Sequence, residues 1–278
     1  MFINYVWCYV LRIKPFSIGS CIFTDGKNLL GFYIIAKNVP SSLSKITSVF
    51  SKYDVNILDI NFSSGVKEGE EGSLFIVADF SKKNIDANRL LEELKLIDIV
   101  SDAEIVREQF PGVLIDSYHF PIVDDKGIRM MLVANYVVDS MFLGVGERFG
   151  DVGLAFLYHQ GVSIGLYLAE FYKSIGADTL RKGLNLFFIF GFSNGFYRAK
   201  IKKFRLSRDK SKIDAVIRFE DMWECEIARK KKCRKAASHF TRGAIAGLVQ
   251  GYLGREVEVL ETKCIAKGEP YCELRVSG

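Results

Sequence analysis

A chain of 278 residues exceeds one typical domain, so its length predicts two domains. Hydrophobic residues make up 49% of the sequence and charged residues 26%, which provides a core and excludes a disordered protein. The net charge of +5 is too small to predict a general nucleic-acid-binding protein, and five prolines exclude a proline-rich linker.

Residues 1–26 form an N-terminal extension, which we interpret as an extra strand or an annexed upstream segment. Its apolar stretch ends at Arg12 and is shorter than the roughly 20 residues that span a bilayer. It also lacks the basic start and the small-residue cleavage site of a secretion signal. Polar residues interrupt the later apolar stretches 130–146 and 184–197, so we expect no membrane span. Six cysteines are few for a disulfide-framed secreted protein, and we expect a cytoplasmic location.

Residues 27–110 alternate short strands with amphipathic helices. The predicted elements are strand 29–39, helix 41–53, strands 56–64 and 72–81, helix 84–97 and strand 103–110. In the first helix, Leu43, Ile46, Val49 and Phe50 share one face. The order β-α-β-β-α-β is that of the ferredoxin-like motif, so this half predicts an α+β fold.

The turn after the first strand reads Asn38-Val39-Pro40-Ser41-Ser42-Leu43. With this turn, residues 27–110 resemble an ACT domain, a regulatory module that senses small molecules and whose turn usually reads Asp-x-Pro-Gly-x-Leu. Ser41 stands where a glycine would let the backbone of a ligand approach. The resemblance implies a ligand-binding regulatory domain, and the alternative is a domain that only packs or dimerises.

Residues 111–278 form the second predicted domain. We expect an extended segment 111–130, a strand or helix over 130–149, a long helix 150–175, strand-rich segments 183–206 and 212–226, a helix 238–254 and a closing hairpin 256–276. Gly153, Gly161 and Gly165 give the long helix a patch of small residues. Another backbone or a ligand can approach such a patch closely, and we favour helix packing.

The C-terminal hairpin carries the sequence Glu261-x-x-Cys264-x7-Cys272. Glu261 and Cys264 have opposite parity along the strand, so a bulge or a strand end is needed to bring them together. The turn 267–270 can return Cys272 to Cys264. Two thiolates and a carboxylate predict a zinc ion as cofactor, and the alternative is two buried cysteines facing each other, reduced or oxidised.

The C-terminal part also carries a set of spaced motifs: Trp223-Glu224-Cys225, Arg242 to Gly247, Gly254 to Val257, Glu261, Cys264, Gly268 and Cys272. With these motifs the second domain resembles a 4-vinyl reductase domain, also called a hydrocarbon-binding domain. That family includes bacterial phenol- and xylene-responsive regulators and a chlorophyll-synthesis accessory protein. The resemblance implies an α/β domain of the NO-signalling/TRAPP-like ligand-binding fold.

In aromatic-sensing members of that family, zinc lies on the equivalents of Glu261, Cys264 and Cys272 and on a cysteine five residues before the helix glycine. Counting back from Gly243, that position is Ser238 here. The predicted metal ligands are therefore Glu261, Cys264, Cys272 and His239. Cys233 as the fourth ligand and a metal-free site are the alternatives.

The resemblance also implies a binding site for a small hydrophobic or aromatic molecule. In the relatives a helix histidine and a tryptophan hold the phenol hydroxyl, and His159 and Trp223 are the analogues here. The predicted ligand-binding residues are Tyr158, His159, Phe219 and Trp223. A core histidine is the alternative for His159, and we expect most of the phenylalanines between Phe187 and Phe196 in the core.

The positive charge is concentrated in two stretches, 198–205 and 229–235. Lys200 and Lys202 alternate with Ile201, which favours a solvated strand face. A nucleic acid, an anionic lipid surface or an acidic partner are alternatives. Because no helix-turn-helix or phosphate-binding loop accompanies these stretches, we do not expect nucleic acid.

Together these features predict a cytoplasmic, homodimeric sensor or regulatory protein that binds a small hydrophobic or aromatic ligand. The absence of a dinucleotide fingerprint and of an acid–base pair favours a binding protein over an enzyme. One alternative is an accessory subunit of a vinyl reductase-like enzyme. The other is an assembly scaffold like the TRAPP subunits, with an acyl chain on a cysteine.

Overall fold

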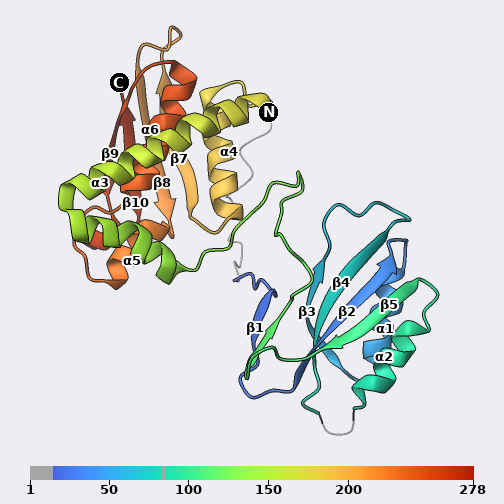
Figure 1. The fold of residues 1–278 in the computed structure, drawn as a ribbon. Coiled ribbons are helices and arrows are strands. Elements are labelled where there is room, and N and C mark those ends of the chain that lie inside the picture. The colour runs from blue at the N-terminus through green and yellow to red at the C-terminus, as the bar shows by residue number, and fades with distance from the viewer. Residues whose placement is uncertain (1–14, 83–84) are drawn as a thin grey trace. The chain divides into compact units, whose positions relative to one another are not determined.

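The computed structural model describes residues 15–82 and 85–278. These residues form two compact units that divide between Met131 and Leu132 (Figure 1). The domain boundary expected at 110/111 therefore falls inside the first unit. Of the N-terminal extension, residues 1–14 lie outside the described residues, and Cys21–Phe23 form a short strand.

The first unit contains β1 (Cys21–Phe23), β2 (Leu29–Lys37), α1 (Ser42–Lys52), β3 (Asn56–Phe62), β4 (Glu71–Asp79), α2 (Ala87–Lys95), β5 (Val100–Val106) and β6 (Val113–Ile115). The antiparallel sheet has the strand order β3-β4-β2-β5. This order, with α1 and α2 as the two crossovers, is the ferredoxin-like topology. The predicted α+β fold is confirmed.

The central strands β2 and β4 are buried on both faces. Phe32 and Ile34 point to the core shared with the two helices, as their alternation in the sequence requires. The opposite face is covered by β1 and β6, which pair with each other, and by the segment that follows β6. There the rings of Tyr33 and Tyr118 stack with centroids 4.0 Å apart.

The second unit contains α3 (Asn135–Ser174), α4 (Leu180–Ser193), β7 (Arg198–Leu206), β8 (Ile213–Glu220), α5 (Trp223–Lys230), α6 (His239–Leu253), β9 (Glu258–Lys263), a 3-10 turn η1 (Ile265–Lys267) and β10 (Cys272–Ser277). Its antiparallel sheet has the order β7-β8-β10-β9. The ambiguous segment 130–149 is largely helical and belongs to α3, whose backbone leaves the helical conformation at Gly150.

Two predictions of strand-rich segments are wrong in part. The run of phenylalanines before residue 194 is the helix α4, and the sequence Trp223-Glu224-Cys225 begins the helix α5. In α4 the buried residues recur with helical spacing: Leu180, Gly183, Leu184, Phe187, Phe188 and Gly191. This spacing was present in the sequence, but the high β-propensity of the intervening phenylalanines obscured it.

Helix α3 lies across α6, and the two helices meet through glycines (Figure 1). A Cβ atom on Gly161 or Gly165 would overlap the backbone of α6, so the small-residue patch serves helix packing, as we favoured. By length and apolar composition alone, α3 is also the one described helix that could cross a membrane. A helix packed in a protein core can have the same pattern, so one such helix is weak evidence for a span.

Candidate functional site

Four buried or half-buried side chains converge at one end of the C-terminal hairpin. One ligand atom from each of Cys225, Glu261, Cys264 and Cys272 lies within 4.8 Å of the others. All three cysteines are fully buried and Glu261 is partly buried. The structure therefore assembles the three residues that the hairpin motif predicted and adds Cys225 from α5.

A register shift in the hairpin brings Glu261 and Cys264 together. Along β9, Lys263 pairs with Glu273 and Glu261 pairs with Leu274, so Thr262 is an extra residue in the ladder. The strand then ends at Lys263, and Cys264 leads into η1. This is the bulge and strand end that the parity of the two residues required.

The charge of this cluster depends on contacts among its own members. Hydrogen bonds from Cys225 and Cys264 lower the pKa of Cys272 to about 4, against the effect of burial. The contacts with Cys264 and Cys272, together with burial, raise the pKa of Cys225. Burial raises the pKa of Glu261 to about 7, and Cys264 adds to this effect. A thiolate at Cys272 is thus favoured in the metal-free protein.

The donor set fits a zinc ion. Zinc takes four ligands from thiolates, imidazoles and carboxylates in structural sites, and three sulfurs with one carboxylate oxygen are such a set. No Lys, Arg or His of the described chain forms an ion pair with Glu261, whose hydrogen bonds come from the Cys225 thiol and the N–H of Ser238. A divalent cation would supply the missing positive charge.

The remaining candidates for the fourth ligand lie outside this cluster. The His239 ring contacts the carbonyl oxygen of Ala236 through Nε2 at 3.2 Å, and burial lowers its pKa. Ser238 is fully buried, and its hydroxyl has no hydrogen-bond partner among the described residues. The prediction missed Cys225 because its segment was expected in a strand, whereas the first turn of α5 directs it to the hairpin.

Glu224, beside Cys225, joins α5 to α6. Its carboxylate is buried and accepts hydrogen bonds from the N–H groups of Phe240 and Thr241, in the first turn of α6. These N–H groups have no partner within their own helix, so Glu224 satisfies donors that would otherwise be buried unpaired. Burial nevertheless raises its pKa to about 8.

Comparisons with known proteins assign this region to a known type of domain. The family model of the 4-vinyl reductase domain matches residues 218–277. This range, which we call the vinyl reductase region, includes the four clustered residues, and the match confirms the resemblance predicted for the C-terminal part. The phenol-responsive sensory domain of the transcription activator PoxR, solved with phenol, has a similar fold with a TM-score of 0.50 and 16% identity. The similarity covers 56% of this chain and 83% of that chain.

Other similarities are partial. An uncharacterized protein of Methanocaldococcus jannaschii is 50% identical over 38 residues, which is 14% of this chain and only 22% of that relative. The ACT domain of a GTP pyrophosphokinase from Chlorobium tepidum covers 29% of this chain and 99% of that chain, with 24% identity and a TM-score of 0.25. A trafficking protein particle complex subunit 3 from Naegleria fowleri, covalently bound to palmitic acid, covers 51% and 90%, with 18% identity and a TM-score of 0.38.

Next to the metal cluster, the vinyl reductase region contributes to an aromatic cluster. The ring of Trp223 lies edge-on to Phe142 of α3 and to Phe240 of α6, with centroids 4.9 and 6.2 Å away. Trp223 and Cys225 belong to the same turn of α5, so a change at one site can be transmitted to the other. Phe219 is fully buried and contacts Phe188 and Tyr197.

The two predicted ligand residues on α3 lie elsewhere on its surface. His159 is exposed, and its ring lies 5.5 Å from that of its neighbour Tyr158. Tyr158 is half-buried under the guanidinium of Arg242, and burial raises its pKa. The structure therefore places Trp223 and Phe219 in the core of the unit and His159 on its outside.

The first unit has a cavity beside the turn that resembles the ACT motif. It measures about 710 Å³ and is lined by the start of α1 and the ends of β2 and β4, including Asn38, Ser41, Ser42, Phe62 and Leu74. Ser41 has φ of 74°, a left-handed conformation that glycine adopts more easily. The backbone thus keeps the turn of the glycine-containing motif although the residue is serine.

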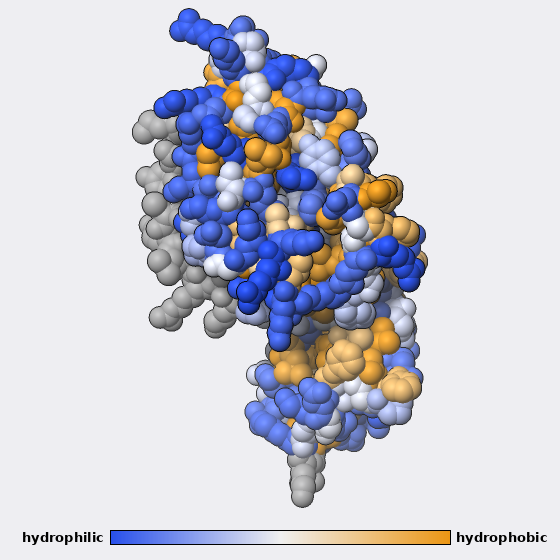
Figure 2. Space-filling view, turned by 90° about the vertical axis from the view of Figure 1, so that its left-hand side faces the viewer, coloured by the Kyte–Doolittle hydropathy of each residue, from blue (hydrophilic) through white to orange (hydrophobic). Residues whose placement is uncertain are grey.

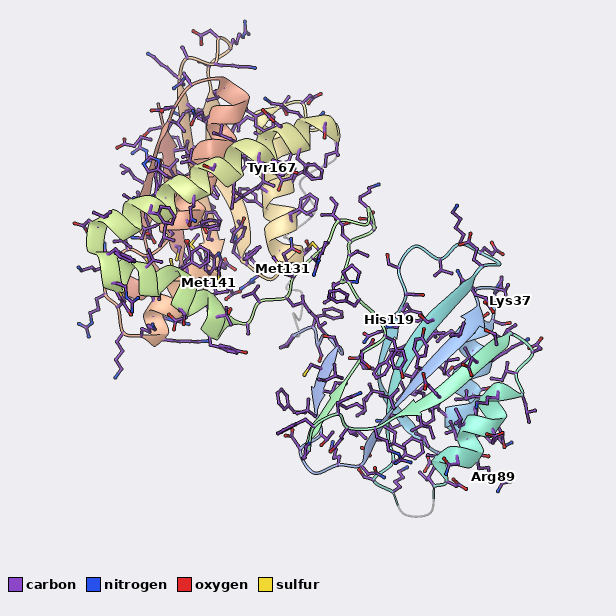
Figure 3. The ribbon with its side chains drawn as sticks, viewed as in Figure 1. Lys37, Arg89, His119, Met131, Met141 and Tyr167 are labelled. Atoms are coloured by element: carbon purple, nitrogen blue, oxygen red, sulfur yellow. The ribbon has the colours of Figure 1, made fainter. Side chains whose placement is uncertain are left out.

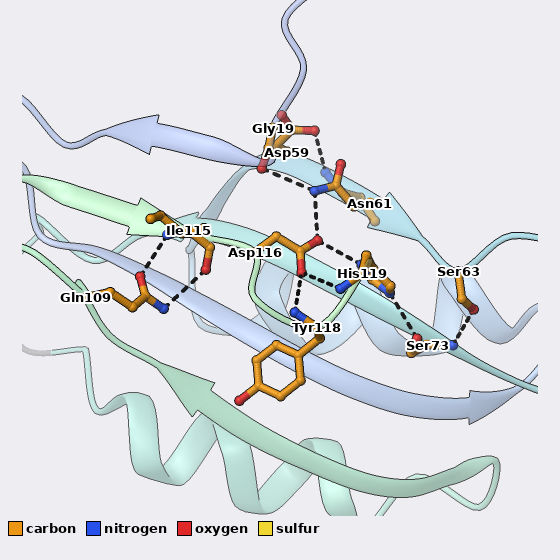
Figure 4. A network of polar contacts seen from close by, with 11 residues as sticks. Gly19, Asp59, Asn61, Ser63, Ser73, Gln109, Ile115, Asp116, Tyr118 and His119 are labelled. Carbon is orange, nitrogen blue, oxygen red and sulfur yellow. Dashed lines mark hydrogen bonds and ion pairs between the residues drawn. The ribbon is translucent and has the colours of Figure 1, made fainter. Parts of the chain in front are cut away.

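A second polar cluster of the first unit joins Asp116, His119 and Ser73 (Figure 4). Nδ1 of His119 lies 2.7 Å from Asp116 and Nε2 lies 2.9 Å from the hydroxyl of Ser73. This is the order of a serine-histidine-aspartate relay. The N–H of Ser73, however, is donated to the Ser63 hydroxyl and cannot stabilise an oxyanion. We interpret the cluster as a clamp that fastens the segment after β6 to the sheet.

Proposed function

We propose that this chain is a ligand-responsive regulatory protein whose vinyl reductase region binds a small hydrophobic or aromatic molecule and holds a structural zinc ion. The observation that carries the proposal is the convergence of Cys225, Glu261, Cys264 and Cys272 in a unit with the fold of a phenol-responsive sensory domain. When bound, zinc would cross-link α5 to the C-terminal hairpin. The four side chains would orient these two elements relative to each other.

The aromatic cluster supports the ligand-binding part of the proposal. Trp223, Phe142 and Phe240 provide apolar and edge surfaces of the kind that enclose aromatic ligands. Because Trp223 begins the helix that carries Cys225, a ligand against its ring would bias the position of α5. We propose that this displacement is the signal, passed to a partner chain by a population shift within a homodimer.

The location and the regulatory role of the first unit are parts of the same proposal. Three thiols that lie close together without a disulfide suit a reducing compartment, and we propose the cytoplasm. The cavity beside Ser41 makes the first unit a candidate for a second small-molecule site. Its donors and acceptors are mostly serine hydroxyls and backbone groups.

Native mass spectrometry with metal analysis, on protein purified without added zinc, tests the zinc and the oligomeric state. We expect one zinc ion per chain and a dimer. An acyl adduct on a cysteine would instead favour the scaffold alternative. Protein that contains no zinc after purification, and takes up none when zinc is added, would refute the metal part.

Ligand binding is tested separately with phenol and larger aromatic molecules. In a Trp7→Phe background, Trp223 is the only remaining tryptophan, so its fluorescence reports on the aromatic cluster. We expect a saturable change that Phe240→Ala weakens and that His159→Ala leaves unchanged. A linear response at all concentrations, identical in both variants, would show that the cluster does not bind these molecules.

A further inference from the structure

The connection between α5 and α6 is the most basic segment of the chain. Six of the seven residues from Arg229 to Lys235 are Lys or Arg, and all six are exposed. Within the described chain only two of them have an acidic partner. Arg229 lies 3.5 Å from Glu226, and Lys231 contacts two acids of α3. The other four charges, on Lys230, Lys232, Arg234 and Lys235, face solvent unpaired.

Beside this loop, the first part of α3 exposes apolar side chains. Lys231 connects the two elements, because its Nζ lies 2.7 Å from Asp139 and 3.4 Å from Glu147. Tyr136 is 77% exposed and Met141 is 57% exposed, while Val138 and Phe142 of the same helix pack on the core. Met141 and, further along the helix, Tyr167 can be located in Figure 3, and Figure 2 shows hydrophobic side chains reaching one face of the molecule between hydrophilic ones.

We propose that this surface, the basic loop 229–235 together with the exposed apolar side chains at the start of α3, binds the anionic surface of a lipid bilayer. Clusters of four to eight Lys or Arg next to an amphipathic helix are typical of binding to acidic phospholipids. Apolar side chains on the adjoining helix enter the boundary between headgroups and acyl chains. The protein lies on the membrane, and α3 remains packed against α6.

The apolar component distinguishes a bilayer from a nucleic acid. Nucleic-acid interfaces are more polar than protein interfaces and make most contacts through charged and polar groups. Here a tyrosine and a methionine are exposed next to the basic loop, with no acid other than the two paired to Lys231 between them. Charge and hydrophobicity on one surface match headgroup phosphates above acyl chains.

Co-sedimentation of the full chain with vesicles tests the proposal. We expect binding to vesicles of phosphatidylcholine with phosphatidylserine, little binding to phosphatidylcholine alone, and release as the salt concentration rises. Reversing Lys230 and Lys232 to Glu should weaken binding by at least about fivefold for each charge removed. Reversing Arg208 and Lys212, exposed on the turn between β7 and β8, is the matched control and should have little effect.

The apolar component has its own matched pair on the same helix. Tyr136→Ser should weaken binding to the anionic vesicles, whereas Tyr167→Ser, at a residue 70% exposed, should not. Zinc content and circular dichroism of each variant show whether the fold is intact. Failure to bind anionic vesicles at low salt, or equal loss in both charge-reversed variants, would overturn the proposal. So would a dimer that Tyr136→Ser dissociates, if vesicles bind neither form, because the surface then belongs to a second copy.

Discussion

Gly247 of α6 lies directly against Val162 of α3, so that a Cβ atom on Gly247 would overlap the carbonyl oxygen of Val162. Gly243 stands in the same relation to Tyr158, and Gly161 and Gly165 of α3 stand so to the backbone of α6. Glycines on both helices thus let the two backbones touch. This contact fixes how close α6, which follows the metal cluster, comes to α3.

Gly247→Ala should therefore destabilise the second unit by about 2–3 kcal/mol, because backbone atoms would have to move apart. The control is Gly144→Ala in α3, where the nearest atom to a new Cβ is 4.0 Å away. That substitution should be neutral or stabilise by up to about 1 kcal/mol, since alanine favours the helix. Thermal and urea unfolding of both variants measure the difference. Equal stability of the two variants would contradict the close contact.

Ser41 provides a prediction of opposite sign. A residue with a Cβ pays about 1–2 kcal/mol in the left-handed region, and glycine does not. Glycine also makes the unfolded chain more flexible, so Ser41→Gly should stabilise the first unit by a net amount below about 1 kcal/mol. Ser44→Gly, inside α1, should instead destabilise it by about 0.5 kcal/mol. If both substitutions destabilise equally, the turn does not have the conformation described.

The sequence predicted the first unit almost completely because its strands and helices each have one dominant period. The alternation in β2 and the helical spacing in α1 agree with their burial. What the pattern did not reveal is that β1 and β6 cover the second face of the sheet. Strands of three residues carry too little periodicity to predict their pairing.

In the second unit the hairpin motif identified three of the four clustered residues, including the need for a bulge. The fourth, Cys225, could not be placed from its position in the chain, because it lies 36 residues before Glu261 and on another element. Only the packing of α5 against η1 brings it to the hairpin. Its presence in the Trp223-Glu224-Cys225 motif was the available signal. The notion that the fourth ligand must lie near Ser238 directed attention to His239 instead.

The clamp of the first unit should make its stability depend on acidic pH. Burial raises the pKa of Asp116, but the hydrogen bonds from His119, Tyr118 and Asn61 outweigh it, so that the pKa is lowered in the folded protein. A lowered pKa stabilises the fold above the unfolded-state value and is lost as the pH falls through the folded-state value. Stability should therefore decline between about pH 5 and pH 2.

Asp116→Asn tests this dependence. It should lower the free energy of unfolding by about 1–3 kcal/mol near neutral pH and flatten the acid limb of the stability curve. Hydrogen exchange of the peptide 113–120, which contains the clamp, measures the effect locally. The exposed Asp125→Asn is the control and should change neither quantity. A protection pattern that is identical in both variants at every pH would refute the role of the clamp.

The metal cluster makes the sharpest prediction, because this chain offers both a ligand and an alternative position for it. Cys225→Ser should reduce zinc affinity more than about 100-fold, the upper end for losing an outer-shell partner. Cys233→Ser, in the basic loop and outside the cluster, should leave it unchanged. The double variant Cys225→Ser with Ser238→Cys should recover zinc binding, because Ser238 is buried and its N–H already contacts Glu261 at 3.2 Å. Zinc bound per chain, measured after dialysis against a chelator, separates these outcomes. Full zinc retention in Cys225→Ser would show that α5 does not provide the fourth ligand.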